Sequence, residues 1–180
     1  MQIPISYLKD ALSLFHYGKG LTERAMQQLT EEQLHSTLDP EMNSVAVMVE
    51  HLSDSMRSRW TDFLTSDGEK PDRDRDAEFV DSGRDRTSLM ARWEQGWICL
   101  FTALEQLTDA DMNRTITIRG ESLTVMQAIN RQLLHTSYHC GQIVFLAKHL
   151  QHENWKNLSI PRGQSAEFNR RMKAGEASQR

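Results

Sequence analysis

Residues 125–150 read VMQAINRQLLHTSYHCGQIVFLAKHL, and this stretch decides the fold class. Its apolar residues recur at steps of three and four, the spacing that brings side chains to one face of an α-helix. Thr124 and Gln127 form a capping-box pattern at its start. We therefore predict a long amphipathic helix with a buried stripe made of Met126, Ile129, Leu133, Thr136, Cys140, Ile143, Ala147 and Leu150.

Three further stretches show helical spacing. Residues 44–64 and 88–107 carry unbroken apolar stripes. Residues 6–29 are interrupted by Gly18 and Gly20, where we expect a kink or a break. Four amphipathic helices of about 20 residues each predict an all-α protein with the architecture of a four-helix bundle.

The segments between these helices differ in kind. Thr30 begins a stretch that fits one short helical turn before Pro40, and residues 115–123 alternate around Arg119-Gly120, which predicts a small β-hairpin. Residues 65–86 hold eight acidic and five basic residues in 22, a link too long for a plain bundle connection. It is either a solvated loop or a loop folded over one end of the bundle that brings charged groups to a site.

Length and composition narrow the class of protein. The 180 residues predict one globular domain over residues 1–166, with a frayed tail from Glu167. The net charge of −4 argues against a nucleic-acid-binding surface and against a basic helix on a membrane. No apolar run approaches the roughly 20 residues that span a bilayer, and the N-terminus lacks a signal-peptide pattern. Cys99 and Cys140 make no disulfide framework, which fits a cytoplasmic protein.

Histidine placement points to a metal. His135 and His139 are four residues apart, so their imidazoles share one face of the predicted helix and can share one ion. At roughly 100° per residue, both lie at the rim of the apolar stripe, as does His51 on the helix over residues 44–64. Three neutral imidazoles leave coordination positions open, which is typical of a catalytic metal site. Alternatively, all three are exposed polar residues without a ligand.

Several motifs resemble a known superfamily. HTSYHCGQI at residues 135–143 resembles the HxxxHxGQI signature on the last helix of the DinB-like superfamily, and NSVAVMVEHL at residues 43–52 resembles its segment that ends in the first metal histidine. SRWTDFLTSDGEK at residues 58–70, RDRDAEF at 73–79 and WKNLSIPRGQS at 155–165 resemble a branch of that superfamily with no settled function. Together these motifs cover nearly the whole chain.

This resemblance implies an up-down-down-up bundle with a metal at one end, often zinc, nickel or iron, and frequent dimers. The better-known relatives are bacillithiol S-transferases and mycothiol-dependent isomerases, in which the metal binds and activates the sulfur of a thiol cofactor. It implies His51, His135 and His139 as the metal ligands here. No residue of this chain is assigned a catalytic role.

Other residues are candidates for lining the site. Gln142 follows His139 on the same helical face, and Tyr138 neighbours His135, so both are expected to line the pocket or to hold the imidazole rings. Charged candidates for recognising an anionic substrate or cofactor are Arg59, Glu69, Lys70, Arg73 and Arg75.

We therefore expect a metal-dependent enzyme that acts on a small molecule, most simply a transferase that uses a low-molecular-weight thiol. A metal-dependent hydrolase would use the same open site with bound water as nucleophile. A non-catalytic metal-binding or stress-response module, and a structural bundle with unmetallated histidines, are the other interpretations. A cavity that reaches the open position of the metal would favour an enzyme. A cytoplasmic homodimer without nucleic-acid or membrane partners is the expected context.

Overall fold

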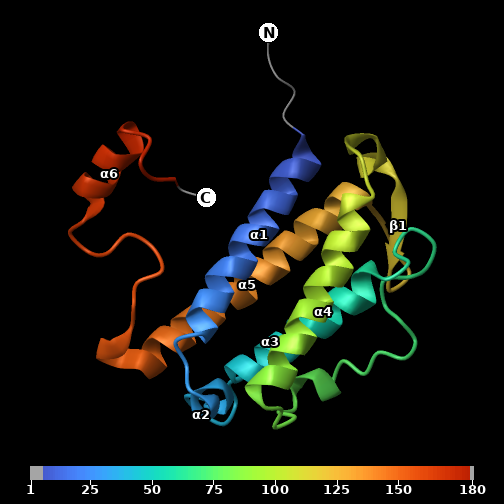
Figure 1. Cartoon of the computed structure of the whole chain (residues 1–180). Coiled ribbons are helices and arrows are strands. Elements are labelled where there is room, and N and C mark those ends of the chain that lie inside the picture. The colour runs from blue at the N-terminus through green and yellow to red at the C-terminus, as the bar shows by residue number, and fades with distance from the viewer. Residues whose placement is uncertain (1–5, 179–180) are drawn as a thin grey trace.

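The computed structural model describes residues 6–178 and is mostly helical, with one small antiparallel hairpin. Four long helices lie alongside one another (Figure 1): α1 (Tyr7–Met26), α3 (Val45–Trp60), α4 (Arg86–Glu105) and α5 (Val125–Gln151). The four helical stretches predicted from apolar spacing are therefore confirmed. No described helix has the length and apolar character needed to cross a membrane.

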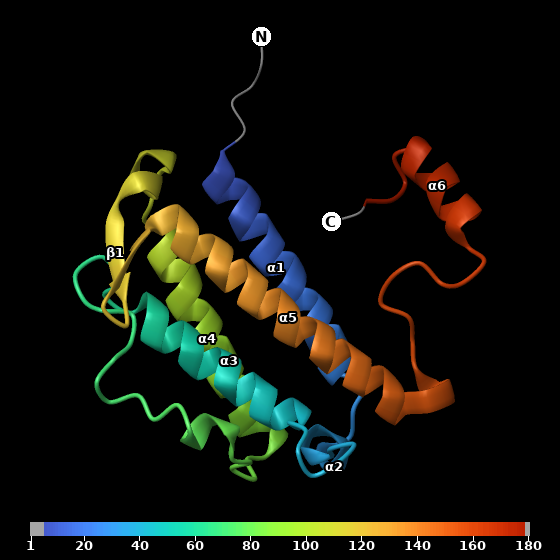
Figure 2. The same ribbon diagram turned by 180° about the vertical axis from the view of Figure 1, so that it is seen from behind.

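The helices form two parallel pairs. Tyr7 Oη contacts Asn130 Oδ1 at 2.7 Å near the start of α1 and α5, and Gln28 Nε2 donates to Lys156 O at 3.1 Å beyond their ends. Hence α1 and α5 run in the same direction, and Figures 1 and 2 show this pair lying beside the second pair, α3 and α4.

The α3–α4 pair is also parallel. Arg92 of α4 binds Asp54 of α3 at 2.5 Å, and about two turns further along both helices Cys99 Sγ lies 3.4 Å from Thr61 Oγ1. An added Cβ on Gly96 would lie 2.7 Å from the Cα of Ser53, so the two helices touch through a position that only glycine can occupy. Because both helices point the same way, the chain must travel back along them between Trp60 and Arg86, which explains the length of that link.

One apolar core lies between the four helices. The two parallel pairs meet there, with the Phe15 and Trp97 ring centres 6.2 Å apart. Met126, predicted to be buried, is instead 37% exposed at the first turn of α5. The largest fully buried side chains are those of Trp93, Trp97, Phe15, Met26, Leu34, Leu52, Met56, Leu89, Leu100, Leu104, Ile129 and Ile143.

Local sequence signals set the helix starts. The Thr124 side chain accepts from Gln127 N while the Gln127 side chain binds the Thr124 backbone, so the predicted capping box is confirmed. Thr30 and Gln33 make the same box at the start of α2 (Glu31–His35), the predicted short turn.

The first helix has no break at its two glycines, so that part of the prediction is wrong. α1 continues through Gly18 and Gly20 without interruption. Each glycine lowers helix propensity by about 1 kcal/mol, but buried Phe15 and Ala25 on either side fix the helix against the core. In addition, Thr22 Oγ1 donates to Gly18 O at 2.9 Å. Tertiary packing therefore outweighs local propensity here.

The predicted hairpin is confirmed as β1 (Thr115–Ile118) and β2 (Glu121–Thr124). Its turn residues Arg119 and Gly120 have φ values of 56° and 75°, the left-handed region that a two-residue hairpin turn requires. The carboxylate of Asp67 accepts from both turn amides, at 2.7 Å and 2.8 Å. The long charged link is thereby fastened to the hairpin.

Three short 3₁₀ helices occur in the connections: η1 (Ala77–Phe79), η2 (Asp109–Asn113) and η3 (His152–Asn154). The tail forms α6 (Ser165–Lys173), which stands apart from the four long helices in Figures 1 and 2. Residues 167–173, part of the tail that was expected to fray from Glu167, are helical in this structure. Arg170 pairs with Glu167 at 2.7 Å one turn away, a local interaction that stabilises a helix without core contacts.

Candidate metal centre

Three histidines meet where α3 packs against α5. His135 and His139 lie one turn apart on α5, and His51 faces them from α3. Each offers a nitrogen within 4.8 Å of the other two, and the three ring centres are 4.8 to 5.1 Å apart. His51 Nε2 and His135 Nε2 are separated by 3.1 Å. This group could hold one divalent metal ion.

The surroundings keep two of these imidazoles uncharged. Burial, together with the charges of His139, His51 and Arg131, lowers the pKa of His135 to about 3. Burial and the charge of His51 lower the pKa of His139 to about 4. His139 Nδ1 is also buried and has no hydrogen-bond partner among residues 6–178. Neutral, partly unsatisfied imidazoles are the form that binds a metal, so the donor set fits a divalent ion.

A buried carboxylate orients His51. Glu78 Oε2 lies 2.8 Å from His51 Nδ1, and the Glu78 side chain is only 3% exposed. An ionised carboxylate can only accept, so the proton sits on Nδ1 and leaves Nε2 free to face the other histidines. Burial raises the pKa of Glu78, but the hydrogen bonds from His51 and Arg73 outweigh it and lower that pKa overall.

Glu78 comes from the link that runs back from α3 to α4. The short helix η1 places it against α3, and Arg73 Nε donates to Glu78 Oε1 at 2.6 Å. The next residue, Phe79, packs its ring 4.6 Å from that of His51. Of the two interpretations of this link, the structure therefore favours the loop that folds over the bundle and brings charge to a site.

A cavity of about 520 Å³ opens beside the histidines, and His51 and His135 form part of its wall. It lies between α3, α5, the hairpin and the returning link. Its other lining residues are Ser55, Arg59, Trp60, Arg73, Arg75, Ile116, Ile118, Arg119, Ala128, Arg131, Gln132, Leu134 and Tyr138.

Residues 2–164 match the family described as "Protein of unknown function (DUF1572)". The chain belongs to this family. No curated protein and no solved structure matches it. The DUF1572 range contains every residue of the histidine group and of the cavity, and it ends just before α6, so the site belongs to the part of the chain that defines the family.

The charged residues predicted from sequence divide into three groups. Arg59, Arg73 and Arg75 line the cavity. Glu69 stands behind it, and its Oε2 accepts from both Arg59 Nη1 at 2.5 Å and Arg73 Nη1 at 3.1 Å. Lys70 points elsewhere: its ammonium donates to Ser66 Oγ at 2.8 Å, and it lines a separate groove.

Tyr138 and Gln142 lie next to His139. The Tyr138 ring contacts the edge of the His139 ring at 4.9 Å rather than His135, and it also borders the cavity. Burial lowers the pKa of His139, and the interaction of its imidazole with the Gln142 side chain raises that pKa. Both residues therefore lie next to the histidine group, but only Tyr138 lines the cavity, whereas Gln142 is not among its lining residues.

Sequence reasoning missed Glu78, Arg119 and Arg131 in this site. Arg131 could have been found, because it precedes His135 by four residues and so shares its helical face. Glu78 had only the unusual length of its link as a signal. The sequence pattern indicated Arg119 only as a residue of the hairpin turn. Nothing in that local pattern shows that Arg119 Nε reaches Glu69 Oε2 at 3.1 Å.

Proposed function

We propose that this protein is a metal-dependent enzyme, a transferase that uses a low-molecular-weight thiol, with one divalent ion held by His51, His135 and His139. The observation that carries the proposal is the cavity that opens onto His51 and His135 beside a buried three-histidine group. A closed structural site would have no such access. A non-catalytic module would not need a cavity of about 520 Å³, which is within the range of small-molecule sites.

A divalent ion at this position would favour the thiolate form of a bound thiol, the form that acts as nucleophile. The chain itself supplies the rest. Glu78 holds the proton of His51 on Nδ1 and so keeps Nε2 available. Trp60 and Ile118 form an apolar wall that limits water, and the arginines of the cavity bind and orient a substrate.

The resemblance to the DinB-like superfamily supports the choice of thiol chemistry. Its HxxxHxGQI signature matches the α5 segment that carries His135 and His139. The two parallel helix pairs are also compatible with the up-down-down-up bundle that the resemblance implies. Zinc, nickel and iron all accept imidazole ligands, so the ion is proposed only as one of these.

The test begins with elemental analysis of the purified protein and of the variants His51→Ala and His139→Ala. We expect nearly one metal per chain in the wild type and a loss of most of it in both variants. His149→Ala is the matched control, because His149 lies at the far end of α5, with its ring 5.3 Å from His152 rather than in the group of three.

Turnover is then measured with a panel of thiols and electrophiles. Thiol-dependent turnover that disappears with the metal supports the transferase, whereas metal-dependent cleavage of esters or amides without thiol would replace it by a hydrolase. If wild type and variants bind equally little metal after loading, the proposal fails.

The biological context is part of the same proposal. We place the enzyme in the cytoplasm as a single-domain protein that forms a homodimer and binds neither nucleic acid nor membranes. One feature supports the dimer: α5 presents the exposed apolar side chains of Leu134, Tyr138 and Phe145 at helical spacing, at 74%, 60% and 66% exposure. Size-exclusion chromatography with light scattering tests it.

A further inference from the structure

The cavity beside His51 and His135 has a one-sided charge. Five of its lining residues are arginines, and none of its lining residues is an aspartate or a glutamate. These guanidinium groups surround a space that reaches a candidate metal position. Their mutual repulsion is electrostatically unfavourable unless anions offset it.

Three of the five arginines already have carboxylate partners behind the cavity wall. Glu69 Oε2 accepts from Arg59 and Arg73, and also from Arg119 Nε at 3.1 Å. Burial raises the pKa of Glu69, but these three cations outweigh it and lower the pKa to about 2. Arg73 pairs in addition with Glu78. These groups are fixed in place, and two carboxylates serve three cations.

The other two arginines, Arg75 and Arg131, have no carboxylate partner among the described residues. Neither guanidinium group makes a hydrogen bond or an ion pair with any residue between positions 6 and 178. The Arg75 guanidinium lies 4.9 Å from the centre of the Phe79 ring, and that ring packs on His51. Arg131 lies one turn before His135 on α5, near enough that its charge acts on that imidazole. Both therefore flank the histidine group from different segments.

The remainder of the wall is apolar. Trp60 of α3, Ile116 and Ile118 of β1, and Leu134 of α5 line the same space. An occupant that suits this cavity therefore combines an uncharged body with an anionic group.

We propose that the cavity binds a small organic anion, whose carboxylate or phosphate group is held by Arg75 and Arg131 while its apolar part lies against Trp60 and Ile118. This assignment rests on the proposed function for the role of that molecule as the substrate or the thiol cofactor. A guanidinium presents two parallel N–H donors that fit the oxygens of a carboxylate or a phosphate, and two such groups can hold one oxyanion from two sides. The volume accommodates a metabolite rather than a polymer.

The experiment uses calorimetry on the full chain with three probes of similar body: phenylphosphonate, phenylacetate and 2-phenylethanol. Each is titrated into metal-free and into zinc-loaded protein, and the zinc content of every sample is measured. We expect both anions to bind at least tenfold more tightly than the neutral alcohol in either form. The tighter of the two anions shows whether phosphate or carboxylate is the preferred group.

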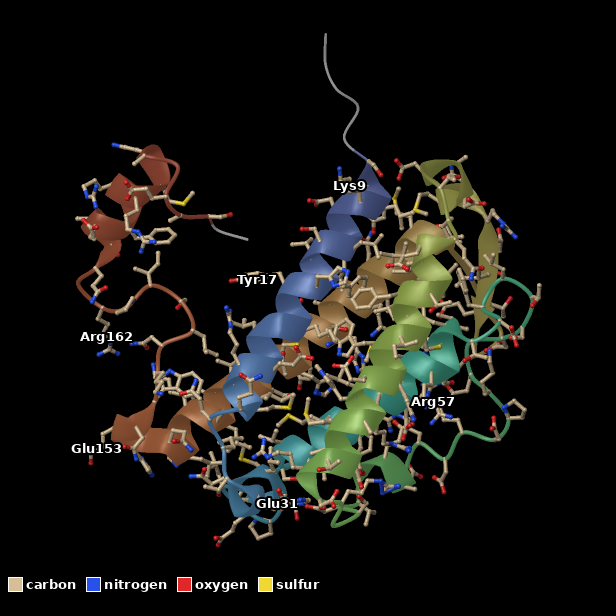
Figure 3. All side chains as sticks on the ribbon, in the orientation of Figure 1. Lys9, Tyr17, Glu31, Arg57, Glu153 and Arg162 are labelled. Atoms are coloured by element: carbon tan, nitrogen blue, oxygen red, sulfur yellow. The ribbon has the colours of Figure 1, made fainter. Side chains whose placement is uncertain are left out.

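The variants are Arg75→Gln, Arg131→Gln and the double variant. Each lost guanidinium should weaken anion binding about tenfold, and the double variant about a hundredfold. Arg162→Gln is the control: Arg162 lies on the segment between α5 and α6, away from the hairpin (Figure 3), and it likewise has no ion pair with any described residue. Its anion affinity should match that of the wild type.

Equal binding of the alcohol and the anions would overturn the inference. So would binding that occurs only in zinc-loaded protein and is undiminished in the double variant, because the anion would then sit on the metal. A protein that holds no zinc but binds anions through both arginines would refute the proposed enzyme and keep this inference. Zinc-dependent thiol transfer by a protein whose anion affinity is unchanged in the double variant would support the proposed enzyme and refute this inference.

Discussion

Replacing Glu78 by glutamine perturbs the contact that orients His51 while it keeps the shape of the side chain. Glu78 now accepts from His51 Nδ1 at 2.8 Å and from Arg73 Nε and Nη2 at 2.6 and 2.9 Å. Glutamine has one oxygen and one NH₂ group, so either His51 or Arg73 must face a donor. If the NH₂ group faces His51, the imidazole proton moves to Nε2, where it blocks a metal.

The expected loss of metal affinity follows from these contacts. One charge-assisted hydrogen bond in a buried site contributes about 1.5–3 kcal/mol. Loss of a carboxylate behind a ligating histidine lowers metal affinity about 10- to 100-fold, which corresponds to roughly 1.4–2.8 kcal/mol. The two figures agree, so we expect Glu78→Gln to weaken metal binding by one to two orders of magnitude.

The assay is a competition titration with a zinc indicator, with circular dichroism to monitor folding. Glu50→Gln is the matched control. Glu50 is also a buried carboxylate on the α3 side of the returning link. Its carboxylate accepts from Ser82 Oγ at 2.5 Å and has no hydrogen bond or ion pair with a histidine of the group. We expect Glu50→Gln to lower stability without changing metal affinity. Equal affinity in Glu78→Gln and the wild type would show that Glu78 does not position His51.

Two further predictions concern stability. Gly96→Ala should lower the free energy of unfolding by about 1–3 kcal/mol, since its Cβ would lie 2.7 Å from the Cα of Ser53; a thermal melt that matches the wild type would contradict the close contact of α3 and α4. The pKa of Glu69 is lowered to about 2, so its contribution to stability is complete above about pH 4.5 and disappears as the pH falls towards 2. Urea denaturation of metal-free protein from pH 6 to 2.5 should therefore show a shallower loss of stability in Glu69→Gln than in the wild type, and parallel curves would refute the role of Glu69.

Periodicity was sufficient to predict the four long helices because their stability depends on burying an apolar stripe. The spacing of Trp93, Trp97 and Leu100 on α4 exemplifies this, and all three are fully buried. The break at Gly18 and Gly20 was predicted wrongly because propensity is local, whereas the packing that keeps α1 continuous comes from other helices. For the same reason α6, which lacks core contacts, gave no apolar pattern to detect.

The histidine group was predictable because each of its members lies on a predicted helix. His135 and His139 are related by a single turn, and the angular position of His51 on its own helix placed it at the rim of the core. Glu78 and Arg119 reach the site through the path of the chain between helices, which no local pattern encodes. The prediction placed Lys70 with the other charged residues because it lies in the same run of sequence, yet its ammonium turns towards Ser66 and away from the cavity.

The route of the chain from α3 to α4 has a consequence for protein engineering. α3 has 16 residues and is about 24 Å long, a distance that about eight extended residues can cover. The segment between Trp60 and Arg86 is much longer than that, so most of it is not needed to join the two helices. It can be regarded as an exchangeable module: a short graft should preserve the helical scaffold and its histidines while removing Glu78, Arg73 and Arg75 together. Ligand preference and metal affinity could then be varied through one loop without redesign of the core.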